Sequence, residues 1–443
     1  MRVRLPRRRR ESHDDDPWHD IVRRYRRRRA IGIGALCVAL ALIGFGIARL
    51  LSPSDGPQRR GGGSTQARTQ RAGKQKPRSR LSPQARAAAR LPLHTQVAQL
   101  FMIGFSGAQP NDPGVKRALQ RPWGGFVLDS GNYSDPTQLA ALTGSLLAAA
   151  STSHRQPPLI AAAQEGGGAS AFAGLPPRSQ QRIGTNGQSS LARSEALRAA
   201  RKLQSLGVNM TLAPVADVGT PGGALEARVF GDESSAVARM VSAAAAGYQS
   251  QGMIAAVGHF PGSGAATQDP DVAQASVGLT LPDLMARDIR PFMAIADRVP
   301  VVVMSNAAYA AYDGVTPAVL LPKVIEGLLR KRLKFAGVVM SDDLAATTAA
   351  TGGSVSTAAV AAVRAGTDLL YVRGAVATRE AAYAAILQAL RQGKLSRDRV
   401  AEAAGRVLAL KRRYRLSSNK PPKPPPTPTP TRPATPGAPG AKP

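Results

Sequence analysis

The chain has 443 residues and a formal net charge of +31 at neutral pH. This length admits two or three domains, or one large barrel with appended segments. The single cysteine, Cys37, excludes an intramolecular disulfide, and no cluster of cysteine and histidine offers a structural metal site.

The net charge is concentrated at the two ends of the chain. Residues 1–90 carry 23 Lys and Arg against 6 Asp and Glu, and the tail from Lys420 adds four cations, which leaves +10 for residues 91–419. Basic arms of this kind bind nucleic acid or anionic lipid headgroups. We expect a membrane rather than a nucleic acid as the partner, because an apolar segment follows the first arginines.

That apolar segment is long enough to cross a bilayer. Residues 30–48 contain no charged side chain, and a helix of this length spans roughly 28 Å. Twelve arginines lie in residues 1–29, so the positive-inside rule places this basic segment in the cytoplasm and the chain after Arg49 outside. The sequence therefore predicts a transmembrane signal anchor over residues 30–50 and a single-pass protein of the cell membrane. A cleaved signal peptide is the alternative, although Ile47–Leu51 makes a poor cleavage site.

Two further segments have compositions typical of chain that does not join a core. Residues 52–88 are rich in Gly, Ser, Gln, Arg and Pro, which predicts a flexible basic linker able to lie along an anionic surface. Residues 418–443 are rich in Pro and Thr, which favours extended polyproline II and excludes a helix. We expect a disordered tail that is solvated rather than bound to a specific partner.

Between the linker and the tail, residues 89–417 alternate between short apolar runs and helix-like stretches such as Ser234–Gln251, Asp283–Asp297 and Ser356–Ala365. Apolar strands of this kind are expected where both faces of a parallel sheet are buried. Eight such runs with helical connections predict an α/β fold, a (β/α)8 TIM-type barrel, with a doubly wound open sheet as the alternative. The runs are Leu100–Phe105, Gly125–Leu128, Leu159–Ala163, Met210–Val215, Ile254–Phe260, Val299–Ser305, Ala336–Ser341 and Asp368–Val372.

Polar residues end or follow five successive runs, the third to the seventh. In a barrel the carboxyl ends of the strands carry the chemistry, because the loops of that face converge there. A polar strand end also arises simply where the chain meets water, but five in succession favour a site. These residues are Gln164-Glu165, Asp217, His259, Ser305-Asn306 and Asp342-Asp343.

Residues 91–415 contain eight motifs in the order Gln99–Phe105, Trp123–Leu128, Gln164–Gly167, Asn209–Val218, Arg228–Gly231, His259–Gly262, Gly337–Leu344 and Ala365–Leu370. In this order and spacing they resemble family 3 glycoside hydrolases of the bacterial β-N-acetylhexosaminidase type. The resemblance implies a (β/α)8 barrel, no cofactor, and a carbohydrate substrate such as a cell-wall or surface glycan. It also implies retaining hydrolysis through a glycosyl-aspartate, which needs a carboxylate nucleophile and a second group that protonates the leaving oxygen.

The segment Val338–Leu344 carries the expected nucleophile, Asp342. This residue has the type and the position, at the end of the seventh run, that the first step requires. The neighbouring Asp343 fits either a like-charged neighbour or an N-cap of the following helix. Judged without the resemblance, an Asp-Asp pair after a strand is more often a cap than a nucleophile.

The resemblance also implies sugar-binding residues. Arg228 and His259 are expected to hydrogen-bond the substrate, since a guanidinium suits hydroxyl and amide oxygens. Glu165 is expected to join them, and Asp217 to order the pocket. The residues alone leave alternatives open: Arg228 could pair with Asp217, and His259 could be a satisfied strand-end residue.

The chain departs from the family pattern at the position of the acid. The usual Asp-Ser-His dyad reads Asp269-Pro270-Asp271, and no histidine follows His259 in the chain. Asp271 is therefore the candidate acid and Asp269 a second candidate. As an acid, Asp271 needs a pKa well above the usual value of about 3.9, and a nearby Asp342 would raise it if the loop folds inward. We expect Pro270 to stiffen the loop.

Four further departures affect sugar binding. The family has an acidic residue, an arginine, a lysine and a histidine where this chain has Ala163, Gly168, Gly258 and Ser263. Two interpretations follow. The first is a membrane-anchored, extracytoplasmic glycosidase of altered specificity that uses Asp342. The second is a catalytically silent relative that binds a glycan or a partner protein.

Overall fold

A computed structural model describes residues 81–172 and 174–416, and eight parallel strands in it close into a barrel. Strand β1 pairs with β12 on one side and with β2 on the other, which leaves no edge strand. This closure confirms the predicted (β/α)8 barrel and excludes the doubly wound open sheet. The strands, in ring order, are β1 (Phe101–Ile103), β2 (Gly125–Leu128), β3 (Leu159–Ala162), β6 (Met210–Thr211), β7 (Ile254–Phe260), β9 (Val301–Met304), β11 (Val338–Asp343) and β12 (Leu369–Val372).

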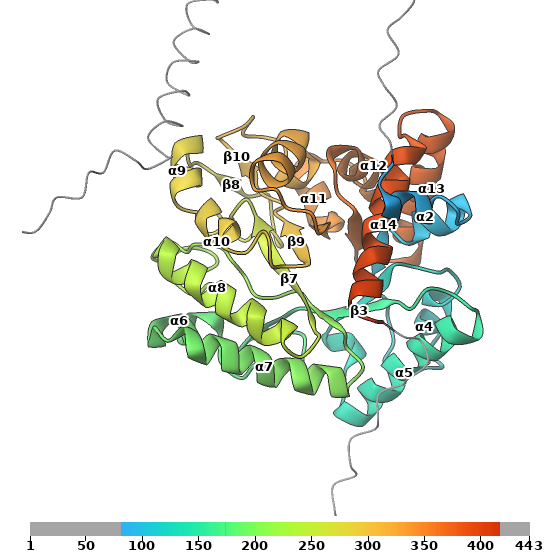
Figure 1. The fold of residues 1–443 in the computed structure, drawn as a ribbon, viewed down its shortest axis with the longest axis horizontal. Coiled ribbons are helices and arrows are strands. Elements are labelled where there is room, and N and C mark those ends of the chain that lie inside the picture. Colours follow the sequence, from blue (N-terminus) through green and yellow to red (C-terminus); the bar gives the residue numbers. More distant parts are fainter. Residues whose placement is uncertain (1–80, 173, 417–443) are drawn as a thin grey trace, which may run out of the picture. The chain divides into compact units, whose positions relative to one another are not determined.

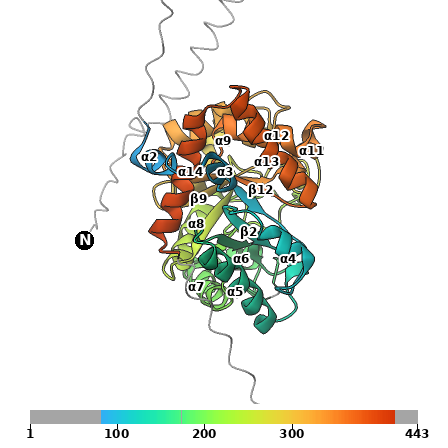
Figure 2. The same ribbon diagram turned by 90° about the vertical axis from the view of Figure 1, so that its right-hand side faces the viewer.

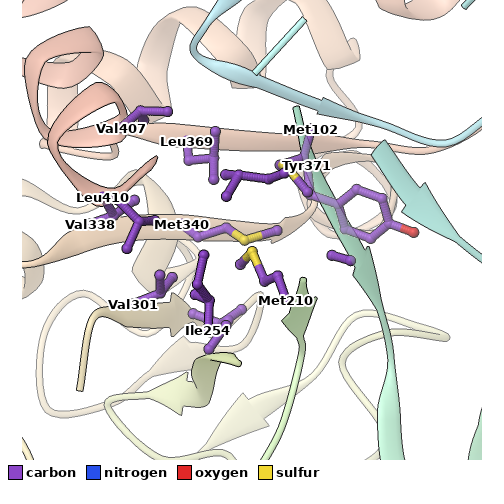
Figure 3. Close-up of a cluster of buried hydrophobic side chains, with 14 of the residues drawn as sticks. Met102, Met210, Ile254, Val301, Val338, Met340, Leu369, Tyr371, Val407 and Leu410 are labelled. Carbon is purple, nitrogen blue, oxygen red and sulfur yellow. The ribbon is translucent and has the colours of Figure 1, made fainter. Parts of the chain in front are cut away.

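The barrel interior is filled by side chains from nearly every strand. Met210, Ile254 and Met340 lie side by side there in Figure 3, and each is almost fully buried. The two methionines fit the tapering space because their unbranched side chains adapt to irregular gaps. Each side chain of this kind contributes roughly 1.5–3 kcal/mol through burial, so the interior is a packed core rather than a channel.

Helices form the outer layer around the strands (Figures 1 and 2). Many begin at a side chain that caps them; Asp135, for example, accepts hydrogen bonds from Thr137 and Gln138 at the start of α5. The helices are α2 (Pro83–Ala88), α3 (Leu93–Ala98), α4 (Pro113–Ala118), α5 (Pro136–Thr152), α6 (Gln180–Asn186), α7 (Ser189–Ser205), α8 (Ser234–Gln249), α9 (Leu281–Ala286), α10 (Ile289–Met293), α11 (Leu344–Thr351), α12 (Val355–Ala365), α13 (Val376–Arg391) and α14 (Arg397–Arg413). Three further helical segments are the 3-10 helices η2 (Ser130–Asn132) and η3 (Ala318–Leu320) and the π-helix η4 (Lys323–Arg332).

Two small sheets lie outside the barrel, at the carboxyl ends of its strands. Strands β4 (Gln164–Gly166) and β5 (Ala169–Ser170) form an antiparallel pair after β3. Strands β8 (Ser276–Val277) and β10 (Ala308–Tyr309) pair in parallel. The second pair ties the long loop after β7 to the loop after β9, which fixes the position of residues 262–275.

The stretch predicted as one helix, Asp283–Asp297, is two helices, α9 and α10. The break lies at Arg287, which has φ −111° and ψ −73°. Pro291 explains it, because a proline ring clashes with the carbonyl of the residue four positions earlier, here Arg287. The Arg287 side chain donates hydrogen bonds to the carbonyl oxygens of Val218 and Gly219 below the candidate site.

Residues Pro83–Ala88, which lie inside the predicted linker, form α2. Ala85 and Ala88 are fully buried, and α2 lies against α14 in both ribbon views. Gly405 permits this close approach, since a Cβ there would meet the backbone of residues 84 and 85 at 2.8 Å. The alanine-rich end of the linker segment therefore joins the folded domain because its small side chains pack closely.

The basic segment 1–29, the anchor 30–50, linker residues 52–80 and the tail 418–443 lie outside the described residues. Among the residues that are described, no helix is both long and apolar enough to cross a membrane. The predicted anchor therefore remains a prediction.

Candidate active site

The seven residues predicted for the site come together at the carboxyl ends of the barrel strands. Asp342 lies near the end of β11 and His259 near the end of β7. The other five lie in β4 or in loops at the same face and join these two through a continuous chain of polar contacts. They are Glu165, Asp217, Arg228, Asp269 and Asp271.

Asp217 fixes the orientation of the His259 ring. Its fully buried carboxylate accepts hydrogen bonds from His259 Nδ1 at 2.8 Å and from the backbone N–H of Ser263 at 2.6 Å. The other ring nitrogen, Nε2, lies 3.5 Å from Asp342 Oδ2. Burial alone would lower the pKa of His259, but the charge and hydrogen bond of Asp217, and then the charge of Asp342, raise it to about 10. His259 is therefore a cation at neutral pH.

Asp342 and Asp271 place two carboxyl groups close together. Their oxygen atoms lie within 4.8 Å of each other, and each negative charge makes ionisation of the other group less favourable. Burial, followed by the charge of Asp271, raises the pKa of Asp342 well above its usual range. Burial also acts on Asp271, but His259 and Arg228 hold its pKa below the usual value. Asp342 is therefore the weaker acid of the two, and its side chain is 14% exposed against 36% for Asp271.

Arg228 binds three carboxylates at once. Its Nε and Nη2 donate to the two oxygens of Glu165, each at 2.8 Å, while Nη1 donates to Asp269 at 3.0 Å and to Asp271 at 2.9 Å. Burial alone would lower the pKa of Arg228, but these acids, Glu165 foremost, raise it, so the group is always charged. The alternative pairing of Arg228 with Asp217 is wrong, because Asp217 is occupied by His259.

These contacts draw the Asp269–Asp271 loop into the site, and Pro270 does not prevent this. The loop leaves practically no free cavity between Arg228, His259 and Asp342. Ordinary small-ligand sites measure roughly 300–1,000 Å³. A sugar therefore has to displace the loop before it reaches Asp342.

Asp343 caps the helix that follows it. Its Oδ1 accepts hydrogen bonds from the backbone N–H groups of Ala345 and Arg373. Asp342 and Asp343 thus differ in role although they are adjacent: one faces the cavity, and the other organises the start of α11. The cap interpretation from the sequence is confirmed for Asp343 alone.

Sequence reasoning missed Asp288, which lies below the site. Its carboxyl group is buried, and burial raises its pKa to about 7 against the opposing charge of Arg287. Gly262, with φ +117°, packs directly on it: a Cβ there would come within 2.5 Å of Asp288 Cβ. No local pattern in the sequence indicates this residue. It lies in the break between α9 and α10, and only the folding of the barrel brings it close to the site.

One trio of described residues has the spacing to hold a cation. His259, Asp271 and Asp342 each offer one ligand atom, and these atoms lie within 4.8 Å of one another. Asp217 supports the His259 ring from behind, as carboxylates often do at metal sites. A metal ion would have to displace the proton from His259 and compete with Arg228 for Asp271.

Comparison with known proteins finds relatives of the barrel domain. The model of the glycosyl hydrolase family 3 N terminal domain matches residues 92–410. A beta-hexosaminidase of Stenotrophomonas maltophilia (strain K279a) is 32% identical over 286 residues, which cover 62% of this chain and 83% of that protein. One of Methylococcus capsulatus (strain ATCC 33009 / NCIMB 11132 / Bath) is 32% identical over 271 residues, covering 60% and 79%.

Solved structures give the same result. A family 3 β-N-acetylglucosaminidase from Paenibacillus sp. str. FPU-7 superposes with a TM-score of 0.70 at 33% identity, covering 74% of this chain and 63% of that longer one. A β-N-acetylhexosaminidase from Beutenbergia cavernae DSM 12333 gives a TM-score of 0.65 at 29% identity, covering 73% and 99%.

Proposed function

Because the chain belongs to glycosyl hydrolase family 3, and to its β-N-acetylhexosaminidase type, we propose that it hydrolyses β-linked N-acetylhexosaminide-type glycans with retention through Asp342. One observation carries the proposal: the carboxyl groups of Asp342 and Asp271 face each other, with ligand atoms within 4.8 Å. Retaining glycosidases keep their two carboxyl groups roughly 5 Å apart, which leaves no room for a water between them.

The first step needs the proton on Asp271 rather than on Asp342. A sugar that enters the site displaces the loop and separates Asp271 from Arg228, which removes one of the two charges, those of His259 and Arg228, that lower the pKa of Asp271. Cationic His259, 3.5 Å away, then stabilises the Asp342 carboxylate. Asp342 attacks the anomeric carbon while Asp271 gives its proton to the leaving oxygen. In the second step Asp271 takes a proton from the water that hydrolyses the glycosyl-aspartate.

Arg228 is the proposed contact for the sugar. When the loop shifts and Asp269 and Asp271 release Nη1 while Asp271 stays opposite Asp342, Glu165 still holds Nε and Nη2 of the guanidinium in place. The freed Nη1 then points a charge-assisted donor at a substrate oxygen. Binding therefore replaces an ion pair within the protein by a hydrogen bond between Arg228 and the sugar. We expect the affinity for substrate to be lower than that of a site in which no ion pair has to be broken.

A second candidate function is a silent relative that binds a glycan or a partner protein without turnover. The observation in its favour is the filled site: every donor group of Arg228 is occupied by the protein itself, and the cavity is small. The absence of a histidine at the acid position points the same way.

Activated aryl glycosides separate the two candidates. An aryl β-N-acetylglucosaminide with an activated leaving group needs little protonation, so the first step proceeds even if Asp271 is a poor acid. We expect the full chain to release the aryl group faster from this substrate than from the β-glucoside, with covalent labelling of Asp342. A folded protein that shows neither release nor labelling with either sugar would support the silent candidate.

We further propose that the barrel acts outside the cytoplasm, anchored by residues 30–50 with the N-terminus inside. The support is the order of twelve arginines and then an uncharged segment. Protease added to spheroplasts should digest the barrel and leave a fragment of the N-terminal region. Full protection of the barrel would reverse the proposed topology.

A further inference from the structure

The two ends of the barrel carry opposite charge. The carboxyl end comprises the last two residues of each barrel strand and the segment that leads to the next α- or π-helix. Its described residues include 13 Asp and Glu, against three arginines and His259. An anionic surface therefore repels this end of the barrel, which holds the candidate active site.

The segments at the amino ends of the strands come together around one cavity. Helices α2, η4 and α14 meet there with the loops before β9 and β11, and α2 and α14 lie side by side in Figures 1 and 2. The cavity is lined, among others, by Ser82, Pro300, Arg330, Phe335 and Arg413. These segments therefore form one surface, opposite the candidate active site.

This surface has a large excess of positive charge. Its segments contain 15 Lys and Arg against four Asp and Glu. They are residues 82–90, 297–300, 323–337 and 397–416. With Asp368 counted as well, and with Lys411 taken as uncharged because burial lowers its pKa to about 7, 14 cations still oppose five acids.

Six exposed cations of these segments define what we call the basic face. They are Arg86, Arg298, Lys334, Arg412, Arg413 and Arg415. Among the described residues, only Arg298 has an ion-pair partner, the exposed Asp297. The helix dipole favours cations in the last turn of a helix, which accounts for the three that lie in α2 and α14. It does not account for the other three, which lie outside the helices.

The chain enters the described domain at the basic face. Leu81, the first described residue, directly precedes α2, and Ser82 binds Glu402 of α14. The linker predicted for residues 52–80 has the composition of a flexible chain, and a chain of that length spans roughly 30 Å on average. A membrane that holds the proposed anchor therefore lies within reach of the basic face.

We propose that the basic face binds the surface of a bilayer that contains anionic lipids, so that the candidate active site faces away from the membrane. This orientation depends on the proposed anchor at residues 30–50. Each Lys or Arg near such a surface strengthens the attraction roughly fivefold, and repulsion of the acidic end favours the same orientation. A soluble polyanion also suits these charges, but the tether gives the bilayer a high effective concentration.

Energy transfer from the barrel to the bilayer tests this orientation. The full chain, with Cys37→Ala and one new cysteine for a donor dye, is reconstituted in nanodiscs whose lipids carry the acceptor. Ala87→Cys places the dye on α2, at the amino ends, and Ser130→Cys places it after β2, at the carboxyl ends; both positions are exposed. In nanodiscs that contain phosphatidylglycerol, we expect more transfer from the dye on α2. The difference should disappear in pure phosphatidylcholine and at high salt.

Charge variants show which surface is responsible. Arg412→Ser, Arg413→Ser and Arg415→Ser together should lower the ratio of oriented to free barrel roughly 100-fold, at about fivefold for each cation. The matched control removes three exposed cations from the first halves of α6, α7 and α8 and should keep the difference in transfer. It combines Arg182→Ser, Arg193→Ser and Arg239→Ser. Melting temperatures show whether each variant is folded.

The outcomes separate the orientation from the anchor. Equal transfer from the two positions in anionic nanodiscs, by protein that elutes with the nanodiscs, would overturn the orientation and leave the anchor standing. Protein that does not elute with the nanodiscs would overturn both. Equal losses in the two triple variants would indicate general attraction rather than a basic face. Saturable binding of polyphosphate, with no difference between the two lipid mixtures, would assign the face to a soluble polyanion instead.

Discussion

At the carboxyl ends of the barrel strands one guanidinium, Arg228, binds three carboxylates, whereas at the amino ends one carboxylate, Asp368, binds three guanidinium groups. The first cluster has excess negative charge, and burial together with the charge of Asp271 raises the pKa of a neighbouring carboxyl group, Asp342. The second has excess positive charge, and its carboxylate stays ionised. Burial would raise the pKa of Asp368, but the three arginines hold it below the usual value.

The contrast shows that the same two kinds of side chain, guanidinium and carboxylate, can serve two purposes. In the Arg228 cluster, two of the three acids, Asp269 and Asp271, lie on one loop, and the proposed reaction requires a substrate to displace that loop. In the Asp368 cluster, all four side chains come from β12, η4 and α14 or their ends, and the carboxylate also accepts a hydrogen bond from the backbone of Val339. Movable partners suit a reaction, while fixed partners suit a framework.

The largest expected effect is at Asp342. Asp342→Ala should lower kcat/KM by about 10⁴-fold or more, because no other carboxylate can take the place of the nucleophile. Asp343→Asn is the control, since Asp343 caps α11 and should keep most of the turnover. Similar losses in both variants would show that the pair acts through structure and not through chemistry.

The second prediction concerns the movable acid, Asp271. Asp271→Asn should lower kcat by about 10²–10⁴-fold for substrates with poor leaving groups, and by much less for nitrophenyl glycosides. The melting temperature should stay the same or rise, because repulsion with Asp342 disappears while Arg228 keeps Glu165 and Asp269. An equal loss with both classes of leaving group would contradict the acid role.

Substitution of the buried carboxylate in the Asp368 cluster should change the stability of the fold. Asp368→Asn leaves three arginines without their buried counter-charge and should lower the free energy of unfolding by about 3–5 kcal/mol. Asp297→Asn breaks an exposed pair with Arg298 and should cost about 0–1 kcal/mol. Chemical denaturation measures both. Equal, small changes would mean that the Asp368 cluster contributes little to the fold.

The free energy of unfolding that each cluster contributes should also depend on pH, and in opposite directions. The folded pKa of His259, about 10, exceeds its usual 6.5, so its stabilisation is complete below pH 6.5 and is lost as the pH rises towards 10. The folded pKa of Asp368 is lowered, so its stabilisation is present above pH 3.8 and is lost as the pH falls through the folded value.

Denaturation of the parent and of His259→Gln across this range tests the first of these slopes. The difference between them should shrink from pH 6.5 to about 10. A difference measurement is needed because burial lowers the pKa of Lys411 to about 7, which adds stability over part of the same range. A constant difference would show that His259 is neutral in the folded state.

The smallest predicted effect tests the start of the folded domain. Ser82 caps α2 and also donates a hydrogen bond to Glu402 on α14 at 2.9 Å. Ser82→Ala should lower the free energy of unfolding by about 1 kcal/mol. Ser396→Ala, which removes the cap of α14 alone, should cost somewhat less. No change for Ser82→Ala would mean that α2 does not stabilise the barrel.

The sequence by itself predicted the eight strands, while the choice of a barrel over an open sheet and the residues of the candidate site also drew on the resemblance to a known family. These features depend on local patterns: apolar runs whose two faces are buried, polar residues at the ends of those runs, and short motifs such as Val338–Leu344. A strand or a motif can be recognised from a few consecutive residues, because the local conformation depends mainly on neighbours in the chain.

Only the tertiary structure decided which of these groups bind one another. Arg228 meets Glu165, 63 positions earlier, and Asp368 meets Arg406, 38 positions later. No local pattern encodes such pairs. The raised pKa of Asp342 and the occupation of Arg228 by the protein's own carboxylates follow from distance and burial. The Coulomb interaction and the cost of desolvation depend on separation in space rather than on separation along the chain.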